Sequence, residues 1–375
     1  MKSVIKKYIA NNTEYMFSIL KELCAIPSPS HFEHKRAEYC KKWLEDAGAK
    51  GVYIDEALNV IFPYNCENSN QIDVFAAHTD TVFPEMESFP YIDDGEKIYC
   101  PGVSDDTASV VLLMLTAKFF LDYNIIPQNG ILFVCNSGEE GLGNLKGTKQ
   151  LFKDFSGRIA RFITFDSSLD IVYDNCVGSH RYEIEVSTIG GHSFSAFGKE
   201  NAIHKISQII DKIYKIQIPQ IEGSQTTYNV GTINGGTSIN SIAQNAKMLC
   251  EYRSNNLECM EIMRKNFETI FRSVCSDETK INVKLVGDRP CGNFDKNKML
   301  DLKKIAIPVI EDVIGKKVTF KTASTDCNVP LSLGVPALGI GLNYHSGVHT
   351  YEEWVDKESI ILGFEVAIKL ALAFL

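Results

Sequence analysis

The hydrophobic and polar positions divide the first part of the chain into short apolar runs and longer segments with helical periodicity. The apolar runs predict strands at Ile72–Ala77, Ile131–Cys135 and Arg161–Phe165, and the periodic segments predict helices at Tyr15–Ile26, His34–Ala47 and Thr107–Tyr123. Strands that alternate with helices are typical of an α/β layer with a mostly parallel central sheet.

The middle of the chain has a different pattern, in which half-exposed strands alternate polar and apolar residues. Strands are predicted at His180–Thr188, Thr226–Ile233, Ala246–Arg253 and Ile281–Val286, and helices at Ala202–Ile216 and Leu257–Ser273. The order β-α-β-β-α-β is that of a ferredoxin-like α+β domain.

The α/β pattern then returns, with a helix at Leu302–Ile314, a strand at Ala337–Ile340 and a last helix at Lys357–Phe374. A chain of 375 residues exceeds one ordinary core, so two domains are expected. We predict a discontinuous α/β domain, residues 1–176 and 289–375, and an inserted α+β domain, residues 177–288.

Composition narrows the class of protein. The net charge of -9 argues against a nucleic-acid partner, which normally meets a basic face. The longest apolar stretch, Val110–Ala117, ends at Lys118 and is too short to span a membrane. The first residues lack the pattern of a secretory signal, and the 11 cysteines include no C-x-x-C pair. We therefore expect a cytoplasmic protein without a membrane partner.

Acidic and histidine side chains follow the predicted strands. They are His78 and Asp80 after the first strand, Glu139 and Glu140 after the second, Asp166 after the third, Asp105 and Asp106 at a helix start, and His349 after the last strand. Ligands bind beyond the carboxyl ends of strands in such sheets. So many carboxylates at one edge would repel each other without cations among them. Mixed imidazole and carboxylate ligation suits zinc, with cobalt or manganese as substitutes.

These stretches resemble a known family. The matching segments are AAHTDTV at 76–82, GVSDDTASV at 102–110, SGEEGLGNLKG at 137–147, FDSS at 165–168, GGHSFSAFGKENAI at 190–203, GGTSINSIA at 235–243, STD at 324–326 and HTYEEW at 349–354. The sequence resembles the dinuclear zinc exopeptidases and deacylases, which include peptidase T, carboxypeptidase G, succinyl-diaminopimelate desuccinylase and aminoacylase. It is most similar in its motifs to the peptidase T-like di- and tripeptidases.

The resemblance implies a site with two divalent metal ions per subunit. In it, His78 and Asp166 bind one ion, Glu140 and His349 bind the other, and Asp105 bridges them. Each ion then keeps an open position, as in catalytic sites. Asp80 would orient His78, and Glu139 would be the general base that takes a proton from the attacking water. The resemblance also implies a cis peptide bond between Asp105 and Asp106.

The resemblance further implies that the α/β domain is catalytic and that the inserted domain is a lid used in dimerisation. His192 would reach the site of a neighbouring subunit and stabilise the oxyanion of the reaction, so we expect a homodimer formed through the lid. Asn240, Arg253 and Arg289 are candidates to hold the carboxylate of the substrate, because amide and guanidinium groups donate hydrogen bonds to it.

Several alternatives remain open or are set aside. His345 lies four residues before His349 and could replace it as a ligand. The glycines from Gly138 to Gly147 match no phosphate-binding motif, and no G-x-S-x-G motif of serine hydrolases occurs at Gly191–Ser195.

We predict a metallopeptidase that hydrolyses amide bonds in small peptides. N-acyl amino acid deacylation is the alternative, and a non-catalytic metal-binding protein on the same fold is a third hypothesis. Glu139 favours an enzyme, because a binding protein has no need of a carboxylate beside the activated water.

Overall fold

The first unit of the computed structural model, Met1–Cys176 with Asn293–Leu375, is built on an eight-stranded sheet. The structure describes residues 2–67 and 69–375. The strands, in sheet order, are β1 (Tyr53–Ile54), β2 (Val60–Tyr64), β6 (Gly130–Asn136), β3 (Ile72–His78), β7 (Ile159–Thr164), β16 (Ala337–Ile340), β8 (Ile171–Cys176) and β15 (Thr319–Ala323). β6, β3, β7 and β16 run parallel, so their carboxyl ends meet at one edge.

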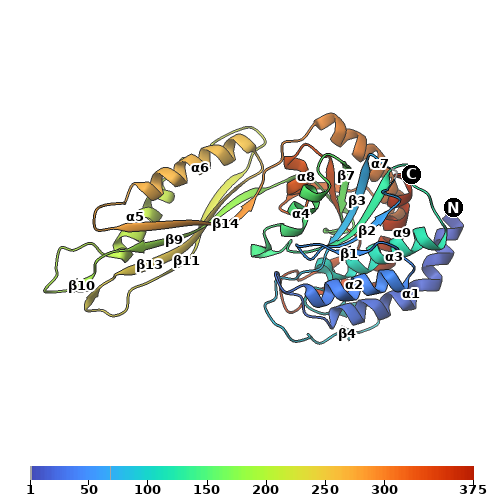
Figure 1. The fold of residues 1–375 in the computed structure, drawn as a ribbon, viewed down its shortest axis with the longest axis horizontal. Helices are drawn as coiled ribbons and strands as arrows, with labels where there is room; N and C mark the ends of the chain where they lie inside the picture. The colour runs from blue at the N-terminus through green and yellow to red at the C-terminus, as the bar shows by residue number, and fades with distance from the viewer. Residues whose placement is uncertain (1, 68) are drawn as a thin grey trace. The chain divides into compact units, whose positions relative to one another are not determined.

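Helices cover both faces of this sheet, as the complete burial of β3 and β6 requires. Figure 1 shows α3 and α9 on one side and α4 and α8 on the other. The helices are α1 (Lys2–Cys24), α2 (His34–Asp46), α3 (Ala108–Asp122), α4 (Lys146–Asp154), α7 (Lys296–Ile314), α8 (Asn328–Ser332) and α9 (Lys357–Leu372). α3 is apolar on almost every side and packs against α1 and α9.

A small antiparallel sheet in the same unit joins two segments that are far apart in the sequence. It comprises β17 (His345–Ser346), β18 (Trp354–Asp356), β5 (Lys97–Tyr99) and β4 (Ile92–Asp93). β18 pairs with β5, and the backbone N–H of Cys100 donates to the carbonyl of Glu353. The segment before β18 and the segment after β5 are therefore held together.

The second unit, Val177–Gly292, has its own sheet and core. The sheet order is β11 (Thr226–Gly235), β13 (Asn245–Ser254), β9 (Gly178–Ser187) and β14 (Lys280–Arg289), all antiparallel. Helices α5 (Ala202–Ile213) and α6 (Leu257–Arg272) pack on it, which confirms the predicted β-α-β-β-α-β order. The unit extends to Gly292 rather than residue 288, since β14 continues to Arg289 and Cys291 joins this core.

The sequence missed the start of the first helix and the weaker strands. α1 begins at Lys2, whereas the prediction began at Tyr15. β2, β8 and β15 were not predicted. Within the described residues, 2–67 and 69–375, no helix combines the length and apolar character that a membrane span needs.

Candidate metal centre

Three neighbouring parallel strands deliver polar side chains to the same edge of the main sheet. His78 is the last residue of β3, Glu139 and Glu140 follow β6, and Asp166 follows β7. The backbone N–H of Phe165 donates to the carbonyl of Ala76, which ties the end of β7 to β3. The juxtaposition therefore follows from the parallel register of the sheet.

Asp105 reaches this edge from a different direction. It lies in the turn η1 (Val103–Thr107), directly before α3, and its φ of -120° and ψ of 85° depart from helical values. The peptide bond between Asp105 and Asp106 is cis, as the resemblance implied. Gly102 begins the turn at a φ of 75°, and a Cβ there would lie 2.6 Å from Cγ2 of Thr81, so glycine is required.

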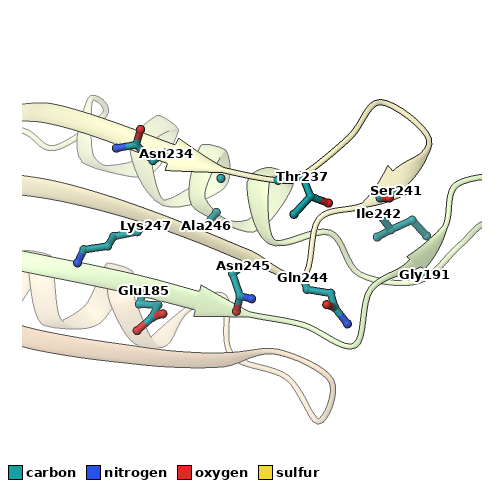
Figure 2. A pocket seen from close by; sticks show the side chains of 12 residues that line it. Glu185, Gly191, Asn234, Thr237, Ser241, Ile242, Gln244, Asn245, Ala246 and Lys247 are labelled. Carbon is teal, nitrogen blue, oxygen red and sulfur yellow. The ribbon is translucent and has the colours of Figure 1, made fainter.

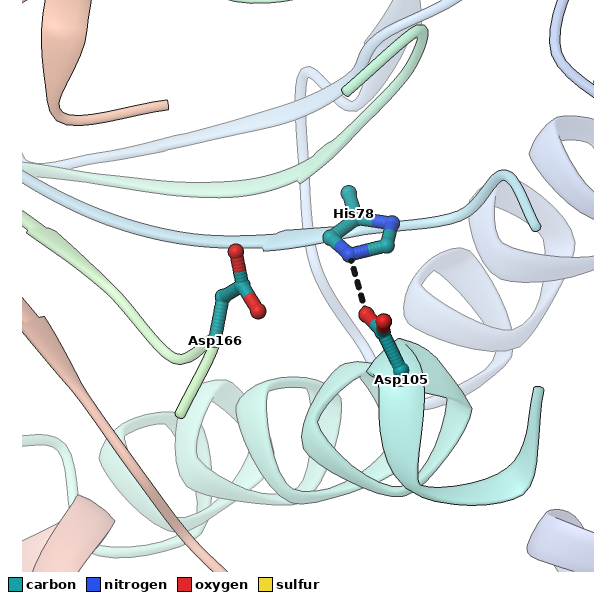
Figure 3. A group of neighbouring side chains, drawn as sticks. All are labelled: His78, Asp105 and Asp166. Atoms are coloured by element: carbon teal, nitrogen blue, oxygen red, sulfur yellow. Dashed lines mark hydrogen bonds and ion pairs between the residues drawn. The ribbon is translucent and has the colours of Figure 1, made fainter. Parts of the chain in front are cut away.

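The side chains at this edge form three overlapping groups of possible metal ligands. One group is His78, Asp105 and Asp166, the second is Asp105, Glu140 and His349, and the third is His78, Glu139 and Glu140; within each, the ligand atoms lie within 4.8 Å of one another. Figure 3 shows the ring of His78 directed at the carboxylate of Asp105, with Asp166 beside them. Nε2 of His78 is 2.9 Å from Oδ1 of Asp105.

Asp105 belongs to the first two groups, so its carboxylate connects them. Its Oδ2 lies 3.1 Å from Nε2 of His349, while Oδ1 faces His78. Nε2 of His349 is also 3.1 Å from Oε1 of Glu140. The five residues that the resemblance assigns to two metal ions are thus brought together within the first unit.

The electrostatics of the group call for positive charge. Burial and the charge of Asp105 raise the pKa of Asp166 well above the usual carboxyl range. The same two causes raise the pKa of Glu140. Hydrogen bonds to Asp105 and Glu140 raise the pKa of His349 to about 10. A nearby cation favours the charged form of such buried acids, and two imidazoles with three carboxylates are suitable donors for zinc-like divalent ions. The donor set therefore fits the predicted ions.

Asp80 contacts the ring of His78 and also supports the loop that carries Glu139 and Glu140. Its carboxylate lies 3.6 Å from Nδ1 of His78, whereas the backbone carbonyl of Asp80 is 3.0 Å from that nitrogen. The carboxylate accepts hydrogen bonds from the backbone N–H groups of Glu139 at 3.0 Å and Glu140 at 2.9 Å, and from Ser30 at 2.6 Å. Asp80 thus fixes the loop that carries the two glutamates.

His345 and His349 occupy different positions. Nδ1 of His345 is 2.7 Å from Oδ1 of Asn343, and burial lowers the pKa of this histidine. Among the described residues, the groups of possible ligands include His349 and not His345. The geometry therefore favours His349 as the ligand.

Sequence reasoning did not assign a supporting role to several buried groups around the ligands. Oδ2 of Asp106 accepts from the backbone N–H of His78 at 3.1 Å. Asp326 is buried and accepts from Nδ2 of Asn136 at 2.5 Å and from the hydroxyl of Thr148, so it ties the end of β6 to α4. Arg36 donates to the carbonyl of Thr79 at 3.0 Å. The STD segment contained Asp326, but its partners are distant in sequence.

His192 and Asn240 lie in the second unit, on adjoining loops. The short strands β10 (Gly191–His192) and β12 (Ser241–Ile242) pair, and the backbone N–H of Ser193 donates to the carbonyl of Asn240 at 2.9 Å. Figure 2 shows the pocket beside these strands, which has a volume of about 490 Å³ and includes Gly191, Thr237 and Ser241 in its lining. The side chain of His192 is exposed.

Arg253 and Arg289 flank the central strand of the second unit. Both lie directly opposite Ser179 of β9, Arg253 on β13 and Arg289 on β14. Arg253 donates from Nε to Glu251 at 2.7 Å, and the same carboxylate receives Nε of Arg181 at 3.2 Å. Arg181 and Arg253 thus share the carboxylate of Glu251, and Arg289 lies on the strand that pairs with the other side of β9.

Comparison with known proteins identifies the class. The model of the peptidase family M20/M25/M40 matches residues 74–373. The chain belongs to this family and is therefore a metallopeptidase-class hydrolase.

Individual relatives match along nearly the whole chain. Its sequence is 23% identical to the Bacillus subtilis protein YqjE, covering 96% of this chain and 98% of that one. Its fold is similar to that of a tripeptidase from Staphylococcus aureus, with a TM-score of 0.77, 20% identity, and coverage of 97% of this chain and 99% of that one. It is also similar to the Bacillus subtilis YXEP protein, described as a dinuclear metal-binding peptidase, with a TM-score of 0.67, 13% identity, and 98% of each chain covered.

Proposed function

We propose that the protein hydrolyses the amide bond of small peptides, as a di- or tripeptide exopeptidase, with two divalent ions held by the first unit. The observation that supports this most strongly is the shared position of Asp105 between the two ligand groups. His78 and Asp166 would bind one ion, and Glu140 and His349 the other. Zinc suits these donors, and cobalt or manganese are substitutes.

Glu139 is the proposed general base. It is 5% exposed, lies among the possible ligands His78 and Glu140, and its backbone is fixed by Asp80. Bound divalent ions would lower the pKa of a coordinated water and polarise the carbonyl of the substrate. Glu139 would accept the proton of that water and deliver it to the leaving amine.

The second unit is proposed to select the substrate. Asn240, Arg253 and Arg289 would hold a carboxylate, since guanidinium groups bind carboxylates in a planar, two-pronged arrangement. His192 would donate to the developing oxyanion from a neighbouring subunit of a homodimer. N-acyl amino acids are the alternative substrates, because a deacylase would use the same metal centre.

The experiment that tests the proposal is hydrolysis of dipeptides, tripeptides and N-acetyl amino acids before and after chelation, with zinc, cobalt or manganese restored. We expect cleavage of the peptides that is lost on chelation and regained with metal. Cleavage of the N-acetyl compounds alone would replace the exopeptidase with the deacylase. Two bound ions without cleavage of any compound would favour a non-catalytic metal-binding protein.

The role of the arginines gives a separate prediction. Arg289→Ala and Arg253→Ala should raise KM at least about tenfold for substrates with a free carboxylate, because each removes a charge-assisted hydrogen bond. Steady-state kinetics with matched free and amidated substrates would measure this. Arg272→Ala, an exposed residue of the same unit, is the control and should leave KM unchanged. Equal KM for wild type and both variants would exclude these arginines from carboxylate binding.

A further inference from the structure

Glu353 is a buried carboxylate that the proposed chemistry does not use. It lies directly before β18, four residues after His349, and is 0% exposed. Its neighbour Glu352 is exposed. A carboxylate that is removed from water in this way needs several hydrogen-bond donors to compensate the loss of hydration.

Those donors all come from the turn that carries Asp105. Oε2 of Glu353 accepts from the backbone N–H of Gly102 at 2.8 Å. Oε1 accepts from the backbone N–H of Ser104 at 2.8 Å, from its hydroxyl at 2.7 Å and from the backbone N–H of Asp105 at 3.1 Å. One side chain thus satisfies three backbone N–H groups within a four-residue segment. N–H groups at the start of a helix have no carbonyl partner inside the helix, so they need an acceptor of this kind.

The segment held in this way determines where the carboxylate of Asp105 lies. Asp105 faces His78 through one oxygen and His349 through the other, at 2.9 and 3.1 Å. A shift of its backbone would move both oxygens together. Glu353 itself is linked to His349 by the short segment between β17 and β18, so it connects the loop of one ligand to the backbone of another.

We propose that Glu353 is a positioning residue that fixes Asp105 and thereby sets the affinity of both metal positions at once. The inference rests on the proposed dinuclear site. It leads to a specific expectation: loss of Glu353 weakens both positions, whereas loss of the terminal ligand His349 weakens mainly one. A purely structural role would lower the stability of the fold and leave metal affinity in the folded protein unchanged.

Glu353→Gln is the decisive variant, because it keeps the volume of the side chain while it changes the hydrogen bonding and removes the charge of the carboxylate. An amide has one acceptor oxygen, and its NH₂ group would face a backbone N–H donor at one end of the turn. That leaves one donor unsatisfied. Glu352→Gln makes the same chemical change at the adjacent exposed position and is the matched control.

The measurement is zinc binding to metal-free full-length protein by competition with a chelator, at a temperature where circular dichroism shows each variant folded. We expect both dissociation constants of Glu353→Gln to rise about 10–100-fold, as for other residues that orient metal ligands. Glu352→Gln should match wild type. Ser104→Ala removes one of the four donors and should weaken both positions in the same direction by a smaller factor.

The outcomes separate this inference from the proposed function. If folded Glu353→Gln binds two ions as tightly as wild type, the positioning role is wrong. If Glu353→Gln does not fold, Ser104→Ala decides, and unchanged affinity in that variant overturns the inference. If wild type itself does not bind two ions, the dinuclear site of the proposed function fails first.

Discussion

Glu139→Gln should lose about 10²–10⁴-fold in turnover while both metal ions stay bound, the range expected for loss of a general base. The amide keeps the shape of the side chain but cannot accept the proton of the attacking water. Glu139 is assigned no metal in the proposed scheme, so binding of the ions should be retained. Turnover and metal content measured on the same preparation would test both halves of the prediction.

Glu140→Gln is the matched control for this experiment. It changes the next residue in the same loop, and Oε1 of Glu140 lies 3.1 Å from His349, within the second ligand group. This variant should lose metal from one position together with activity. Near-normal turnover in Glu139→Gln, or metal loss equal to that of Glu140→Gln, would contradict the assignment of Glu139 as the base.

The elements that the sequence predicted well are those with strong hydrophobic patterns. β16 has the predicted bounds, and β3 and β6 extend the predicted ranges by a single residue at one or both ends. β8 and β15 were missed because Asp174, Asn175 and Lys321 interrupt their apolar pattern. Their pairing in the sheet is decided by tertiary contacts rather than by local preference.

The candidate site likewise contains residues that the sequence could place and residues that it could not. Residues directly after strands could be placed at one edge from the sequence, because parallel strands end together. The backbone contacts of the supporting side chains Asp80 and Glu353 could not be predicted, because each binds a segment that is distant in the sequence. Asp80 bonds to the backbone of residues 139 and 140, and Glu353 bonds to residues 102–105. No spacing rule indicates contacts of this kind.

His192→Ala should lower turnover by about 10²–10³-fold without loss of metal, the effect typical of removing one oxyanion donor. His192 is exposed, and so are the apolar side chains Phe194 and Phe197 beside it. Exposed aromatic residues around a polar group are typical of surfaces that meet another protein. Kinetics and metal content of the variant, with the exposed His204→Ala of the same unit as control, would measure the effect.

Whether His192 acts on a neighbouring subunit can be decided by mixing two inactive variants. In a dimer of His192→Ala with Glu139→Gln, one site combines an intact Glu139 with an intact His192 from the other chain. Random exchange of equal amounts should therefore restore about a quarter of wild-type activity, because half of the dimers are mixed and each has one complete site. As a control, a chain that carries both His192→Ala and Glu139→Gln, mixed with Glu139→Gln, should restore no activity, because no chain then has an intact Glu139. A monomer by light scattering, or mixed dimers without recovered activity, would exclude action between subunits, and His192 would then have to serve its own chain or no catalytic step.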